Sequence, residues 1–264
     1  MTRARSSKSV QAGEKANSTR ASSAIPASNL VRGEWLRRVE AEYRSAAITQ
    51  HLTLWLMQIG ASPDLVRLGL RIASDELAHA ELSHATYARA GGRELPRIAR
   101  ETLGLVRHDA EPLEHDVARV GLEVFCLGET VAVPLFKELR ERCVVPVARR
   151  ALDRVLRDEV RHRDFGWTLV PALLELPDPA MAASIRALVE RVLPSAFARL
   201  RAVYAPEAAR SKTRVTDDER AWGLLPPARY GEILHRTVER DWVPRFARIG
   251  IDAQRAWEAG SSDS

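Results

Sequence analysis

Apolar residues recur along most of this chain at spacings of three and four, the period expected of helices that bury one face. Alternating runs rich in β-branched residues are few, and the Asn-Gly and Asp-Gly dipeptides typical of hairpin turns are absent. The pattern of apolar and polar positions therefore predicts an all-α fold.

Four long helices are expected in the first two thirds of the chain. They cover about residues 33–59, 62–90, 112–142 and 146–175, and glycine or proline residues stand at most of their ends. The connection over residues 91–111 is long enough to cross from one end of a helical bundle to the other. Pro134 lies inside the third helix, where we expect it to kink the helix or to free a backbone carbonyl.

Residues 177–264 are expected to form further helices packed on this bundle. The pattern predicts a helix over about 178–204, a short capped turn at 216–219 and a last helix from about 227 that Pro244 interrupts. These helices either cover one end of the bundle or form the interface of a homodimer.

The N-terminal residues differ in composition and charge from the rest of the chain. The chain has a formal net charge of +5, and most of it lies in residues 1–29, which hold five basic residues and one acid. This Ser- and Ala-rich tail is expected to be disordered, because it has too few large apolar groups to offset the entropy of ordering. Since the remaining residues are close to neutral, a nucleic-acid partner is not expected.

Several other classes of protein are also not expected. No run approaches the eighteen or so uncharged apolar residues of a membrane span, and the N-terminus does not resemble a secretory signal, so we expect a soluble cytoplasmic protein. The two cysteines form no CxxC pattern and define neither a disulfide framework nor a zinc site.

The candidate chemistry lies where polar residues interrupt the apolar stripes of the four helices. Six such residues stand out: Glu42, Glu76, His79, Glu129, Glu159 and His162. A carboxylate on an inward face is costly unless it is paired or bound to metal. A Glu and a His three residues apart share one face of a helix, so each Glu-x-x-His segment can aim both side chains at one ion.

The spacing of the six residues carries more weight than the motif. The chain has four Glu-x-x-His segments, and an isolated inward Glu or His more often belongs to a salt bridge or a hydrogen bond. Glu81 lies about 140° around its helix from Glu76, so Glu81 and His84 cannot share the same centre. Glu232 and His235 lie on a polar stripe that we expect to face solvent. Six inward residues from four successive helices favour metal binding over coincidence.

With one Glu from each of two helices and one Glu-x-x-His from each of the other two, the chain resembles the ferritin-like di-iron carboxylate superfamily. That superfamily includes bacterioferritins, rubrerythrins and di-iron oxygenases, and the resemblance covers about residues 30–176. It implies a four-helix bundle with a long crossover between helices 2 and 3, followed here by a C-terminal helical extension.

The resemblance also implies a role for each residue. Glu42 and Glu129 would each bind or bridge the metals, Glu76 and Glu159 would bridge them, and each histidine would bind one ion. In several such families an Asp precedes the Glu of each motif and orients the imidazole of the opposite motif. Asp75 and Asp158 match that position.

Four carboxylates and two imidazoles form a hard site that suits iron, and manganese or one ion of each would suit the same ligands. The expected function is activation of O2 to oxidise a small organic substrate, with electrons from an external donor. Two alternatives stay open. One is a ferritin-like protein that handles iron or scavenges peroxide, and the other is a metal-free helical bundle that serves as an interaction module.

Overall fold

The computed structural model describes residues 25–205 and 214–260, and this part of the chain contains helices and connections but no strand. The all-α prediction is therefore confirmed. The first helices are α1 (Asn29–Gln58), α2 (Pro63–Arg89), the short η1 (Arg100–Thr102), the continuous run α3 (Leu113–Val120), η2 (Gly121–Glu129) and α4 (Thr130–Glu141), and α5 (Pro146–Leu174). The C-terminal helices are α6 (Pro179–Tyr204), α7 (Asp217–Ala221), α8 (Pro227–Thr237), η4 (Val238–Trp242), α9 (Val243–Arg248) and α10 (Ala253–Ala259).

Local capping explains where the helices begin. Helix α1 starts four residues before the apolar pattern indicated, because the Ser28 hydroxyl accepts a hydrogen bond from the backbone N–H of Val31. Ser62 caps α2 in the same way, with Pro63 at the first helical position. The expected capped turn is also present, as Thr216 and Glu219 form a reciprocal capping box at α7. Residues 1–24 of the expected disordered tail lie outside the described residues.

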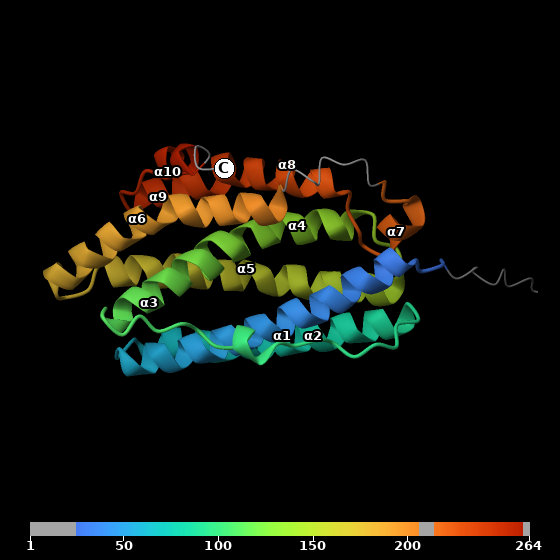
Figure 1. The fold of residues 1–264 in the computed structure, drawn as a ribbon, viewed down its shortest axis with the longest axis horizontal. Coiled ribbons are helices and arrows are strands. Elements are labelled where there is room, and N and C mark those ends of the chain that lie inside the picture. The colour runs from blue at the N-terminus through green and yellow to red at the C-terminus, as the bar shows by residue number, and fades with distance from the viewer. Residues whose placement is uncertain (1–24, 206–213, 261–264) are drawn as a thin grey trace, which may run out of the picture.

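The connection between α2 and α3 runs along α1 (Figure 1). The backbone N–H of Arg97 donates to Glu40, the Arg44 side chain donates to Thr102, and the backbone N–H of Leu105 donates to the His51 ring. Because the contacts move toward the end of α1 as the connection proceeds, α3 begins near that end of the helix. The connection closes on Asp116 of α3, whose carboxylate accepts hydrogen bonds from Arg107 and His108.

The helices form three layers (Figure 1). The first layer contains α1 and α2, the second contains α5 and the run from α3 to α4, and the third contains α6 and the helices from α8 to α10. The third layer covers the face of the second layer opposite to α1 and α2. Helix α7 lies at one end of the bundle, where the carbonyls of Trp222 and Gly223 accept hydrogen bonds from Trp35 and Arg38 of α1 (Figure 1). A single apolar core extends through all three layers.

The irregularity expected near Pro134 lies upstream of it. Helix α4 continues through Pro134, and the preceding segment η2 is a π-helix. A π-helix shifts the hydrogen-bond register, and the Trp242 indole N–H of the third layer donates to the carbonyl of Cys126 in this segment at 3.0 Å. Gly166 of α5 lies directly against the same segment, where an added Cβ would be 2.7 Å from the backbone nitrogen of Cys126. The third layer and α5 therefore both hold η2 in place.

The C-terminal part of the chain contains more separate helices than the apolar pattern predicted. Pro244 stands in the first turn of α9, after the π-helical η4, and Gly250 ends α9 with a positive φ of 72°. Asp252 then caps α10, a helix that the pattern did not separate. In the described part of the chain, no helix combines the length and the apolarity needed to cross a membrane.

Candidate metal centre

Polar side chains from four helical segments meet inside the first two layers. They are Glu42 of α1, Glu76 and His79 of α2, Glu129 at the end of η2, and Glu159 and His162 of α5, and none is more than 9% exposed. These are the six residues that the sequence indicated, and the structure brings them into two overlapping groups.

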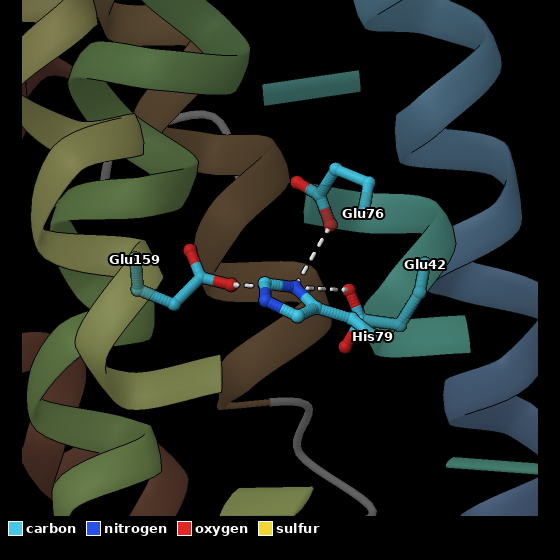
Figure 2. Close-up of side chains that lie close together, drawn as sticks. All are labelled: Glu42, Glu76, His79 and Glu159. Carbon is cyan, nitrogen blue, oxygen red and sulfur yellow. Dashed lines mark hydrogen bonds and ion pairs between the residues drawn. The ribbon is translucent and has the colours of Figure 1, made fainter. Parts of the chain in front are cut away.

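His79 lies at the centre of the first group, which also contains Glu42, Glu76 and Glu159 (Figure 2). Its Nδ1 atom is 3.3 Å from Glu76 Oε2, 3.8 Å from Glu42 Oε2 and 4.0 Å from Glu159 Oε1. One ligand atom from each of the four residues lies within 4.8 Å of the others. One nitrogen and three carboxylates from three helices could thus hold one ion.

The second group contains Glu76, Glu129 and His162, again with ligand atoms within 4.8 Å of one another. His162 Nδ1 is 3.3 Å from Glu76 Oε1 and 3.6 Å from Glu159 Oε2. Glu76 belongs to both groups, and Glu159 lies near both imidazoles, whose centroids are 5.7 Å apart. The arrangement offers two neighbouring ion positions with these two carboxylates between them.

The outer nitrogens of the two histidines face the aspartates of the opposite motifs. His79 Nε2 is 3.2 Å from Asp158 Oδ2, a hydrogen bond between α2 and α5. His162 Nε2 is 3.7 Å from Asp75 Oδ2, which is longer than a hydrogen bond. The resemblance implies a contact between each aspartate and the histidine of the opposite motif. This contact is a hydrogen bond for His79 and a longer contact for His162. An aspartate at Nε2 leaves Nδ1 directed at the carboxylates.

Two arginines that sequence reasoning did not select hold these aspartates. Arg154 pairs with Asp158 and donates to Asp75 Oδ1 at 2.9 Å. Arg161 donates to Asp75 Oδ2 at 2.8 Å and to Asp158 Oδ1 at 2.9 Å. Both arginines lie one turn from Asp158 on α5, so helical spacing could have identified that contact. The bridge to Asp75 needs the packing of α2 on α5.

Ser45 is a further contact that the sequence did not indicate. Its hydroxyl donates to Glu76 Oε1 at 2.9 Å, so α1 helps to orient the carboxylate that both groups share.

Burial controls protonation in this cluster. It raises the pKa of Glu42 to about 7 and that of Glu159 to about 8, and it raises the pKa of Glu129 well above the ordinary range, where the charge of Glu159 adds to the effect. Glu76 is the exception, because the adjacent His162 and His79 rings outweigh burial and hold its pKa well below the ordinary value. Its negative charge and that of Glu42 raise the pKa of His79 to about 11 against the effect of burial. Without a metal, the cluster retains protons at neutral pH.

The donor atoms themselves indicate whether metal ions fit. Glu159 Oε2 and both ring nitrogens of His162 are buried without a hydrogen-bond partner in the described part of the chain. An unpaired buried polar group costs about 1–3 kcal/mol, and a metal–ligand bond would remove that cost at Glu159 Oε2 and at the His162 nitrogen facing it. Oxygen and imidazole donors with four carboxylates suit two hard or borderline divalent ions. The residues present therefore fit a two-metal site.

The other Glu-x-x-His segments lie outside the cluster, as expected. Glu81, His84, Glu232 and His235 are exposed, and the His235 ring packs edge-on against Trp257. These two segments therefore contribute nothing to the buried site.

No protein-family model matches this chain, and no curated protein or solved structure matches it. The resemblance drawn from the motifs therefore remains a proposal that rests on residues and geometry.

Proposed function

We propose that residues 30–176 form a ferritin-like four-helix bundle that binds two iron ions and activates O2 to oxidise a small organic substrate. Manganese, or one ion of each metal, would suit the same ligands. The connection along α1 and the order of the ligands along the chain support the bundle assignment. The observation that carries the proposal is the convergence of four buried carboxylates and two imidazoles with unpaired donor atoms between them.

The roles of the side chains follow from their positions. Glu42, Glu76, Glu129 and Glu159 would neutralise two divalent cations, and His79 and His162 would each bind one of them through Nδ1. Held by these residues in the reduced state, two iron ions would supply two electrons to dioxygen, and an external donor would have to restore those electrons. Asp158 accepts a hydrogen bond from His79 Nε2 and so keeps the proton off the binding nitrogen. Burial excludes bulk water from the site.

Anaerobic titration with Fe(II) tests metal binding directly. We expect about two ions per chain, as in carboxylate-bridged helical bundles, and consumption of O2 by the loaded protein. Glu159→Ala should lose at least one ion, because it removes a carboxylate that lies near both imidazoles. Glu123→Ala is the matched control, since Glu123 pairs with Arg199 outside the cluster. Metal binding that is absent, or that Glu159→Ala leaves unchanged, would refute the proposal.

One observation favours the metal-free alternative. Protonated histidines beside Glu76 form a charge-paired network that is consistent without any ion. In that case Fe(II) should not bind, and Glu159→Ala should change only stability and the interaction of the helices with a partner. A chain that binds two ions, consumes O2 and deposits ferric mineral in a high-mass shell would instead indicate iron handling.

A further inference from the structure

The two imidazoles of the cluster differ in how firmly they are held. His79 has a hydrogen-bond partner at each ring nitrogen, Glu76 at 3.3 Å from Nδ1 and Asp158 at 3.2 Å from Nε2. Within the described residues His162 has none, and its Nε2 atom is 3.7 Å from Asp75 Oδ2. The ligand groups differ in the same direction, because the group with His79 has four members and the group with His162 has three. The His79 position and the His162 position for an ion are therefore not equivalent.

Arg161 accounts for the longer contact at His162. Its Nη2 atom donates to Asp75 Oδ2 at 2.8 Å, and this is the carboxylate oxygen that faces His162. Arg154 donates to the other oxygen of Asp75 at 2.9 Å. Both arginines reach Asp75 from α5, the helix that also carries His162, so guanidinium and imidazole approach the same carboxylate from the same side. A charged donor makes the stronger hydrogen bond to a carboxylate.

No such competition occurs at Asp158. Its arginine partners all belong to α5, the helix of Asp158 itself, whereas the imidazole that reaches it comes from α2. On α2 the residue before His79 is Ala78, which takes the place that Arg161 has before His162. A methyl group cannot donate to Asp158. His79 therefore has no competitor from its own helix, and the two Glu-x-x-His segments differ in this one neighbouring residue.

We propose that Arg161 is a positioning residue that makes the two ion positions unequal in affinity, with the His162 position the weaker. An aspartate at Nε2 fixes the ring and raises the basicity of the binding nitrogen, and loss of such a partner weakens metal binding by about 10–100-fold. Arg161 takes this partner from His162 and leaves His79 with its own. The centre then loads in order, first at His79 and second at His162. This inference rests on the proposed function, which requires both ions.

Titration of the metal-free, full-length chain with Mn(II), followed by electron paramagnetic resonance of the free ion, tests the inequality. We expect two binding steps whose dissociation constants differ by at least about tenfold. His162→Ala should abolish the weaker step and leave the tighter one, which assigns the steps to the two positions. Two equal steps, or a loss of the tighter step in His162→Ala, would overturn the proposal.

Arg161→Met tests the cause, because methionine retains an unbranched side chain and removes the donors. We expect the weaker step to tighten by about tenfold, since Asp75 Oδ2 is released to His162. Arg157→Met is the matched control. Both variants remove a donor from Asp158 Oδ1, and only Arg161→Met also frees Asp75. A weaker step that is unchanged or loosened in Arg161→Met would show that Arg161 does not displace His162, and the proposal would fail.

A second variant keeps the test decisive if Arg161→Met does not fold. Ala78→Arg introduces a guanidinium before His79, at the place equivalent to Arg161. We expect the tighter step to weaken by about tenfold, and an unchanged tighter step would contradict the proposal.

Oxygen consumption is measured on Fe(II)-loaded samples of the same preparations. Two unequal steps without oxygen consumption would refute the proposed function alone. Two equal steps with oxygen consumption would refute the role of Arg161 alone, and a chain that binds no ion would refute both.

Discussion

Gly166→Ala tests the idea that close packing of α5 on η2 positions the metal cluster. Gly166 lies one turn after His162 on the inner face of α5. A Cβ at this position would be 2.6 Å from Phe125 Cβ, 2.7 Å from the Phe125 carbonyl carbon and 2.7 Å from the Cys126 nitrogen. These atoms belong to the backbone or are attached to it, so no side-chain rotation can relieve the contact. The two helices would have to separate by more than half an ångström to restore ordinary contact.

The magnitude follows from two opposing effects. Overpacking of this kind costs about 1–3 kcal/mol, and the rigid contact places Gly166→Ala near the upper end. Alanine in a helix is favoured over glycine by about 1 kcal/mol, which offsets part of the cost. We therefore expect the free energy of unfolding to fall by about 2 kcal/mol, equivalent to a decrease in Tm of about 4–8 °C for a chain of this size. Displacement of η2 should also weaken metal binding through Glu129.

Urea unfolding of the two proteins, followed by circular dichroism, measures the change. Gly33→Ala is the control, because Gly33 is also helical but an added Cβ would meet only Arg37 Nη1, at 3.6 Å. The control should gain up to about 1 kcal/mol. The reasoning fails if Gly166→Ala is as stable as the unmodified chain, or if the control loses as much stability.

Three further changes address other contacts. Asp158→Asn should weaken Mn(II) binding by about 10–100-fold in a metal titration, whereas the exposed Asp164→Asn should leave it unchanged. Trp242→Phe should cost about 0.5–1.5 kcal/mol in urea unfolding, because it removes the indole hydrogen bond to the carbonyl of Cys126, and an unchanged midpoint would contradict this. Asp116→Asn should destabilise the chain at neutral pH. Hydrogen bonds from the connection outweigh burial and lower the pKa of Asp116, so the stabilisation is complete above the ordinary pKa of about 4 and is lost as the pH falls from there through the lowered pKa of the folded chain. A deficit that persists in acid would oppose this account.

The third layer has a physical role in the candidate site. Trp242 is fully buried and donates to a carbonyl three residues before Glu129. The segment that presents Glu129 is thus held from one side by the third layer and from the other by Gly166. The C-terminal helices therefore help to position a site to which they contribute none of the six acidic and histidine residues.

The sequence by itself determined the long helices and the six inward polar residues. Side-chain direction in a helix follows from local geometry, so spacing alone placed Glu76 with His79 and Glu159 with His162 on inward faces. The same argument placed Glu81 and Glu232 outside the cluster. Capping at residues 216–219 was equally local.

Only the tertiary structure decided which distant residues meet. The bridge from Arg154 to Asp75 depends on the packing of α2 on α5, and the bond from Trp242 to Cys126 joins residues 116 positions apart. The hydrogen bonds from Trp35 and Arg38 to the carbonyls of Trp222 and Gly223 likewise form only where α1 meets the C-terminal segment. Such contacts depend on how whole helices are placed, and neither helical periodicity nor residue spacing carries that information.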